Sequence, residues 1–351
     1  MTTLQIIGVS VLGFIGLILF LNLLGRKHFN PKGKFKKASP PKQLKIGKNR
    51  VEFLSEGDKI SGFLFIPQDA MKGEKKPAII LMPPHSGVKE QTAGIYAQKL
   101  SEQGYITLTF DPRGFGESTG HKGLVSPWLM VEDQKNAVDF ITSLDMVDNS
   151  NLFNFGICAG AGVATDATIS DSRIKALALV SPYVTYSKDG TNNSNFVKQM
   201  LITVGGFVRL IYRLTGKDLT TVPVPVDEKK ASGGAIPVSP MTLGMMTYYL
   251  PGKPGDTPTW ENIVSMNAIS AGLDWSVFDR ADNLKVPTFM VYGTKAESIE
   301  GSVQLYDQIK SPKEKLVLDG ASHFETYYKP KYVEPDIQGI TEFINNQISQ
   351  N

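Results

Sequence analysis

The stretch NLFNFGICAGAGVATDATIS, residues 151–170, constrains the fold of this 351-residue chain more than any other. It joins an apolar run typical of a buried strand to a helical pattern, and Gly156 and Gly160 flank Cys158 at two residues on either side. Glycine is needed in a tight strand-to-helix turn because packed backbones leave little room for a Cβ. The stretch predicts that Cys158 is presented on a sharp turn as a nucleophile. The alternative is a buried structural cysteine, since free cysteines are often fully buried.

The rest of the body alternates β-rich runs with helical patterns, which predicts a mostly parallel sheet with helices on both faces. We expect an opening hairpin around Glu56-Gly57-Asp58. The further strands are expected at 78–82, 104–111, 151–158, 174–182, 287–293 and 315–320, with helices at 92–103, 131–144, after Cys158 and at 334–348.

This alternation fails between about residues 184 and 279, which are rich in Gly, Pro, Ser and Thr. A segment of this size between two strands predicts a cap inserted over the carboxyl edge of the sheet. A surface excursion without contact to the site is the alternative. One apolar helical stripe runs from Phe196 to Leu214. Gly205 and Gly206 within it each cost about 1 kcal/mol relative to Ala, so we expect a kink or a break there.

The N-terminus is apolar and uncharged over residues 4–24, about the length that crosses a hydrocarbon core. Residues 1–25 are therefore expected to form a transmembrane anchor, 26–47 a basic, proline-containing linker, and 48–351 the folded domain. The basic residues lie on the C-terminal side of the apolar run, which predicts a single-pass protein with its catalytic domain in the cytoplasm.

The charge distribution argues against a nucleic-acid-binding protein. Nine of the 37 Lys and Arg residues lie between residues 26 and 48, and no acidic residue occurs before residue 49. The remaining 28 basic residues are outnumbered by 34 acidic ones, so the body is acidic. A basic arm on an acidic body suits an anionic lipid surface better than DNA or RNA.

A cysteine nucleophile needs a base, and His323 in GASHF is the candidate because it follows a late strand. The acid that orients the base is expected after PTFMVYG, where Glu297 is the nearest; Asp279 or an acid of the cap is the alternative.

An oxyanion hole needs two backbone N–H groups. One is expected from Ala159 and the other from the loop after Met82, at Ser86 or Gly87. His85 either shapes that loop or is a solvated loop histidine.

Taken together, these motifs resemble the α/β-hydrolases, on the side of dienelactone-hydrolase-like and X-prolyl-dipeptidyl-peptidase-like proteins. The resemblance rests on GICAGAG, GASHF and DPRGFGEST (residues 111–119), and covers about 51–184 and 287–348. It implies a Cys-His-acid triad with Cys158 as nucleophile. The chain departs from the family in two places: His85-Ser86-Gly87 replaces the usual His-Gly pair, and Ala296 occupies the usual place of the acid.

The sequence thus predicts a membrane-anchored α/β-hydrolase that cleaves a carboxylic ester, lactone or thioester through an acyl-cysteine, with an apolar acyl compound, a small molecule rather than a macromolecule, as its substrate. Acyl transfer to another acceptor, or a non-catalytic binding protein of the same fold, are the alternatives. No metal or cofactor is expected, because no two histidines have ligand-like spacing and no glycine-rich phosphate loop is present.

Overall fold

A computed structural model describes residues 3–27, 29–38, 43–70, 73–184, 195–229, 239–273 and 275–349. Within these residues the core is an eight-stranded sheet with strand order β1-β2-β4-β3-β5-β6-β9-β10. The first three strands in this order pair antiparallel and the rest pair parallel. The strands are β1 (Gly47–Ser55), β2 (Asp58–Ile66), β3 (Lys76–Met82), β4 (Ile106–Phe110), β5 (Val147–Ile157), β6 (Ile174–Val180), β9 (Thr288–Gly293) and β10 (Lys313–Leu318).

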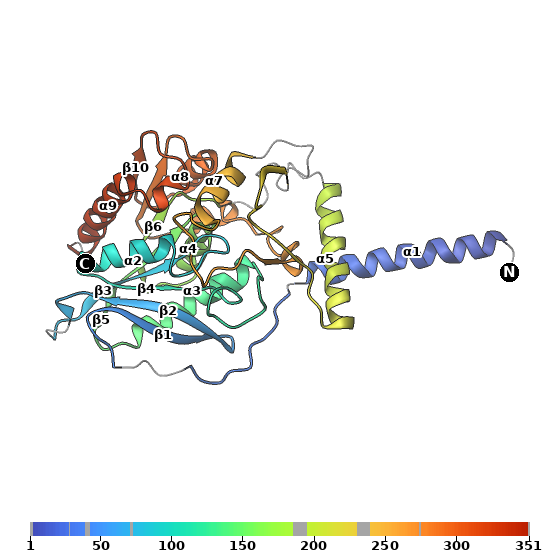
Figure 1. Cartoon of the computed structure of the whole chain (residues 1–351), viewed down its shortest axis with the longest axis horizontal. Helices are drawn as coiled ribbons and strands as arrows, with labels where there is room; N and C mark the ends of the chain where they lie inside the picture. The colour runs from blue at the N-terminus through green and yellow to red at the C-terminus, as the bar shows by residue number, and fades with distance from the viewer. Residues whose placement is uncertain are drawn as a thin grey trace.

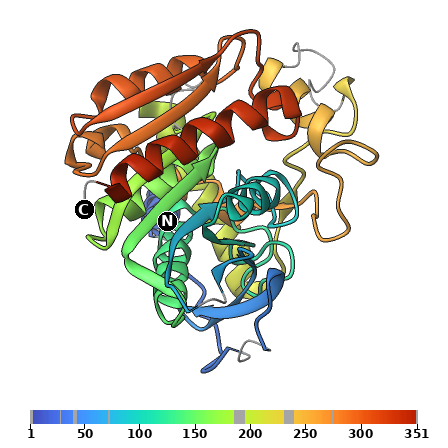
Figure 2. The same cartoon turned by 90° about the vertical axis from the view of Figure 1, so that its left-hand side faces the viewer.

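Helices cover both faces of this sheet, as the alternating pattern predicts. Along β3, Ile80 packs into one apolar core with α3, α4 and α8, whereas Ile79 and Leu81 pack into the other with α2 and α9. Figure 2 shows α9 lying across the sheet. These helices are α2 (Thr92–Glu102), α3 (Pro127–Thr142), α4 (Ala159–Ile169), α8 (Ile299–Gln308) and α9 (Pro330–Ser349).

The opening hairpin is confirmed. Ser55 pairs with Asp58, so the turn has two residues, Glu56 with φ 48° and Gly57 with φ 87°. Positive φ at both positions gives a turn whose twist matches that of the strands. The preceding segment lies along this turn: Phe35 N–H donates to the Gly57 carbonyl, and the Lys32 ammonium contacts Glu56 at 2.6 Å. Residues 29–38 and 43–46 contain no helix or strand, and His28 and 39–42 of the expected linker lie outside the described residues.

Residues between β6 and β9 form the insertion expected at 184–279. Its described elements are α5 (Asn195–Thr215), the strand pair β7 (Thr220–Thr221) and β8 (Val264–Ser265), α7 (Pro240–Tyr249), and the 3-10 turns η2 (Met266–Ala268) and η3 (Phe278–Asn283). Residues 185–194, 230–238 and 274 lie outside the described residues.

The expected kink in α5 is wrong, because α5 is one continuous helix. Its glycines serve close packing instead. A Cβ at Gly206 would overlap the Leu21 carbonyl oxygen of α1 (Thr3–Arg26), and one at Gly25 would overlap the Ile202 carbonyl of α5. Gly206 thus lets the two helices cross with their backbones in contact.

Helix α1 extends away from the body from this crossing point (Figure 1). The Arg209 guanidinium of α5 holds its end by donating to the Leu24 and Gly25 carbonyls at 2.8 and 3.1 Å. Several apolar side chains of α1 are exposed, among them Leu12 (70%) and Phe14 (64%). Nevertheless, no helix within the described part of the chain is both long and apolar enough to cross a membrane, so the expected transmembrane helix at 1–25 is not supported.

Candidate active site

Cys158 lies on the sharp turn that the sequence predicts, between β5 and α4. Its φ of 57° and ψ of −125° are strained for a residue with a side chain. Three backbone hydrogen bonds hold the turn: Cys158 N–H donates to Val180 O at 3.1 Å, and its carbonyl accepts from Ala161 and Tyr183 N–H at 3.0 and 2.9 Å. The thiol is therefore fixed at the N-terminus of α4, whose partial positive charge favours a thiolate.

The flanking glycines are required by packing. A Cβ at Gly156 would lie 2.6 Å from the Ala161 Cα, and a Cβ at Gly160 would overlap the carbonyl oxygens of Met82 and Pro83. The turn consequently packs directly on the loop that follows β3. Cys158 is 8% exposed and lines a cavity of about 310 Å³. The thiol is therefore largely buried yet faces space that a ligand could occupy.

His323 lies beyond the end of β10, on the same carboxyl edge of the sheet as Cys158. Its side chain is fully buried, and this burial lowers the pKa of the imidazole to about 3. The ring is held at both nitrogens: Nδ1 lies 2.8 Å from Ser298 Oγ, and Nε2 lies 2.9 Å from the Tyr327 hydroxyl. The imidazole is thus neutral and rigidly oriented.

Tyr327 connects His323 to the nucleophile. Burial, followed by interaction with Cys158 that includes a hydrogen bond, raises the pKa of Tyr327 well above its usual value. The Tyr327 hydroxyl therefore interacts with the Cys158 thiol and lies within hydrogen-bond distance of His323 Nε2.

The expected acid does not contact the imidazole. The Glu297 carboxylate accepts a hydrogen bond from the backbone N–H of His323 at 3.0 Å, whereas Ser298, one residue later, bonds the ring. The assignment of Glu297 as the group that orients the ring is therefore wrong: it fixes the loop that carries His323. The alternative acid, Asp279, is exposed on η3.

Of the expected oxyanion donors, Gly87 is excluded because its N–H already donates to Pro84 O at 2.9 Å. Ala159 is the first residue of α4, so its N–H has no acceptor within the helix. Ser86 has φ 54°, and its N–H makes no hydrogen bond to any described residue. Ala159 and Ser86 therefore remain as the two candidate donors. The Ser86 hydroxyl is also buried and has no partner among the described residues.

A buried ion pair holds the loop that carries Ser86. The Lys89 ammonium and the Asp111 carboxylate are both fully buried and lie 2.7 Å apart, and Asp111 also accepts from the Lys89 backbone N–H at 2.8 Å. From the cap side, the Trp260 indole donates to the Ser86 carbonyl at 3.0 Å. The position of the Ser86 N–H thus depends on DPRGFGEST and on the insertion.

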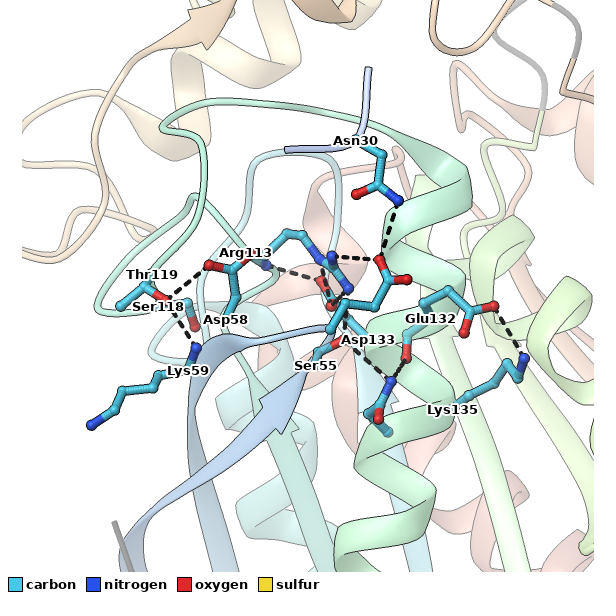
Figure 3. A network of polar contacts seen from close by, with 12 residues as sticks. Asn30, Ser55, Asp58, Lys59, Arg113, Ser118, Thr119, Glu132, Asp133 and Lys135 are labelled. Carbon is cyan, nitrogen blue, oxygen red and sulfur yellow. Dashed lines mark hydrogen bonds and ion pairs between the residues drawn. The ribbon is translucent and has the colours of Figure 1, made fainter. Parts of the chain in front are cut away.

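The rest of DPRGFGEST is structural. Figure 3 shows Arg113 between α3 and the hairpin: it lies 2.6 Å from Asp133, donates to Ser55 at 2.6 Å and contacts Glu56 at 3.1 Å. This motif fastens the antiparallel edge of the sheet to α3 and presents no side chain to the Cys158 cavity.

The comparisons with known proteins agree with this fold. The family model described as serine aminopeptidase, S33, matches residues 84–230. The crystal structure of hypothetical protein PA2218 from Pseudomonas aeruginosa aligns with a TM-score of 0.76 and 26% identity, covering 92% of this chain and 100% of that chain. The chain is an α/β-hydrolase.

Two curated relatives cover most of this α/β-hydrolase. The uncharacterized protein YcjY of Escherichia coli (strain K12) is 29% identical over 310 residues, which are 86% of this chain and 99% of the relative. The polyketide transferase claH of Penicillium crustosum is 27% identical over 283 residues, 78% of this chain and 90% of the relative. The narrower resemblance to dienelactone-hydrolase-like proteins stays a prediction.

Sequence reasoning missed two residues of this α/β-hydrolase site, Tyr327 and Ser298. Tyr327 follows His323 by four residues in HFETY, and the 3-10 turn η4 (Glu325–Tyr327) brings its hydroxyl back to the ring. That spacing was the available signal. Ser298 gave no such signal, because only the packing of the two loops decides which side chain reaches Nδ1.

The cavity beside Cys158 is formed largely by the insertion. Thr221, Pro223, Met241, Met245 and Tyr249 line it together with residues of the sheet edge. The insertion therefore covers the site, and the alternative of a surface excursion without contact to it is wrong. His85 also lines the cavity, and burial lowers the pKa of its imidazole to about 4, so it is not a freely solvated histidine. Among the described residues no cluster of histidine, cysteine and carboxylate side chains could hold a metal ion.

Proposed function

We propose that this α/β-hydrolase cleaves an activated acyl bond, in an ester, lactone or thioester, through an acyl-cysteine at Cys158. The observation that carries the proposal is the strained Cys158 turn at the N-terminus of α4, open to a cavity lined by apolar side chains of the insertion. A strained backbone persists where the surrounding structure holds it, and such positions cluster at functional sites.

The proton route follows the contacts of Tyr327. As the sulfur attacks the acyl carbon, the thiol proton passes to the Tyr327 oxygen, and the Tyr327 proton passes to His323 Nε2. The carbonyl oxygen becomes an oxyanion, for which Ala159 and Ser86 supply N–H donors. The leaving alcohol or thiol takes the proton back along the same route, and water, activated by His323, then releases the acid.

The absence of a carboxylate at His323 Nδ1 limits the kind of acyl bond that the enzyme can cleave. A ring whose pKa lies near 3, oriented by a serine hydroxyl, is a weak base, and its protonated form gains no carboxylate stabilisation. Amide cleavage requires a strong proton donor for the leaving amine. A thiol leaves easily as its anion because its pKa is about 8.5. We therefore favour thioesters and reactive esters over peptides.

The test is an intact-mass measurement of the full-length protein after mixing with p-nitrophenyl acetate. We expect one acetyl adduct that peptide mapping locates at Cys158, release of p-nitrophenol, and loss of both in Cys158→Ala. His323→Ala is expected to slow adduct formation by about 10²-fold. Turnover that persists unchanged in Cys158→Ala would refute the proposal, and the absence of any adduct would favour a non-catalytic binding protein.

Acyl transfer is the second candidate, because the similar protein claH is named a polyketide transferase. Transfer and hydrolysis share the acyl-cysteine and differ only in the acceptor. Addition of an alcohol or amine acceptor during turnover distinguishes them: an enzyme that transfers yields the new ester or amide in addition to the free acid.

We propose further that the N-terminal segment attaches the enzyme to a membrane, with the catalytic domain in the cytoplasm. The support is the exposed apolar surface of α1, including Phe14 and Leu23 (each 64% exposed), followed by a basic segment that carries no acid before residue 49. Flotation with vesicles of phosphatidylcholine and phosphatidylserine tests the attachment. Phe14→Ser combined with Leu23→Ser is expected to abolish flotation, and protease protection in cells reports the orientation.

A further inference from the structure

A second cavity, of about 320 Å³, lies beside the Cys158 cavity. His85, Thr221 and Val264 line both, so these three side chains form the partition between them. Thr221 belongs to the exposed two-residue strand β7, and Val264 of β8 is half-buried. The partition is thus one side chain thick and lies at the edge of the fold rather than in its core.

Most of the residues that line only the second cavity are apolar. Leu201 of α5, Ala268, Ile269 and Leu273 line it, as do Pro127 at the start of α3 and Val125 just before that helix. Its described lining contains no aspartate, glutamate, lysine or arginine. An aliphatic chain has no polar group that would lose hydrogen bonds to water on entering this cavity. A charged or strongly hydrogen-bonding group would lose them and find few partners here.

We propose that this second cavity binds the distal part of a long aliphatic acyl chain whose carbonyl carbon lies at Cys158. The inference rests on the proposed function and names its substrate class. The carbonyl end meets the thiol and the oxyanion donors, the chain passes His85 and Thr221, and its far end lies between α5 and η2. The two cavities have similar volumes, so the second doubles the apolar space available to the substrate.

The second cavity lies close to the exposed apolar helix α1, which is where an acyl chain from a membrane would arrive. Leu201 lies on α5, and α5 crosses α1 at Gly206, where Asn22 of α1 also donates to Thr203 at 3.2 Å. The acyl-chain end of the site therefore lies on the side of the body to which the exposed apolar helix is attached.

The experiment compares p-nitrophenyl acetate, octanoate and laurate, below their micelle concentrations, with the full-length enzyme. Each methylene group that enters the cavity is expected to raise kcat/KM by about fourfold until the cavity is full. Ala268→Leu fills the cavity and is expected to lower kcat/KM for laurate by about tenfold or more while acetate changes by less than about twofold. Met266 also lines this cavity, so Met266→Ala enlarges it and is expected to extend the preference to palmitate.

Val222→Leu is the matched control, because Val222 is exposed beside β7 and lines neither cavity. Equal losses for acetate and laurate in Ala268→Leu, or no dependence on chain length in the wild type, would overturn the inference. Calorimetric binding of laurate is measured in parallel, so that failure of the proposed function is distinguishable. If laurate binds, Ala268→Leu weakens this binding and no ester is turned over, the acyl-cysteine proposal is refuted and the acyl-chain cavity is supported. If laurate does not bind and no ester is turned over, both proposals are refuted.

If Ala268→Leu does not fold, the chain-length preference of Met266→Ala tests the inference instead. A shift of preference from laurate towards palmitate supports the inference, and an unchanged preference overturns it.

Discussion

The buried imidazole of His323 predicts a specific loss of stability in acid. In the folded protein its pKa is about 3 because the ring is removed from water, whereas in an unfolded chain a histidine has a pKa of about 6.5. Above about pH 6.5 neither state binds the proton, and the group contributes no pH dependence. Below it only the unfolded state binds the proton, so the free energy of unfolding falls by about 1.4 kcal/mol per pH unit. Between about pH 7.5 and 5, integration gives a loss of about 2 kcal/mol.

The assay is urea denaturation of full-length wild type and His323→Asn at several pH values, followed by tryptophan fluorescence. The quantity of interest is the difference between the two proteins, because contributions of all other titrating groups cancel in it. We expect the wild type to lose about 2 kcal/mol relative to His323→Asn over this range. Phe324→Leu is the control: it disturbs packing against the same ring, whose centroid lies 4.9 Å away, but retains the imidazole. It is expected to follow the wild-type pH dependence.

Parallel pH dependences of wild type and His323→Asn would refute the reasoning. They would mean that the imidazole titrates near its usual pKa in the folded protein. The ring would then be accessible to water, and the contacts with Ser298 and Tyr327 would not describe the resting state.

Three further predictions concern residues around the site. Tyr327→Phe removes the hydroxyl between Cys158 and His323, so kcat for p-nitrophenyl acetate is expected to fall by about 10²-fold with little change in KM; an unchanged kcat would mean that the thiol proton reaches His323 directly. Burial raises the pKa of Asp336 to about 8, so its ionisation in the unfolded chain destabilises the fold as pH rises from about 4 to 8. Asp336→Asn is therefore expected to be more stable than the wild type in urea by up to about 4 kcal/mol at pH 7, and an advantage that does not grow with pH would contradict this. Lys89→Met leaves Asp111 buried without its partner and is expected to cost about 3–5 kcal/mol in the same assay, where a loss below about 1 kcal/mol would contradict it.

Local patterns allowed much of the fold to be predicted. The hairpin at Glu56-Gly57 depends on two residues that adopt positive φ, and the Cys158 turn depends on glycines two residues away. The strands that carry the site are short apolar runs whose ends are marked by turn residues. The carboxyl ends of neighbouring parallel strands meet at one edge, so His323 could be placed on the same edge as Cys158 from chain order alone.

Packing between distant segments could not be predicted in the same way. The glycines of α5 indicated a kink in isolation, but they are explained by α1, which begins about 200 residues earlier in the chain and crosses at Gly206. Glu297 and Ser298 are adjacent, and only the relative placement of the loops after β9 and β10 decides which of them reaches the ring and which reaches the backbone of His323. A displacement of one residue is beyond what spacing can determine.

The presence of Ser298 instead of a carboxylate at His323 Nδ1 also changes the chemistry that this fold can support. With a carboxylate on Nδ1, the imidazole could carry a full positive charge during the reaction, as cleavage of an amide requires. With Ser298 there, the charge is stabilised only by a hydroxyl, and burial opposes it further. Under the mechanism we propose, catalysis would depend on an acyl donor whose leaving group departs without much help and on binding energy from the remainder of the substrate. The long acyl chain that we propose for the second cavity would supply that binding energy at a distance from the weak base, so the proposed mechanism and the proposed cavity favour the same class of substrate.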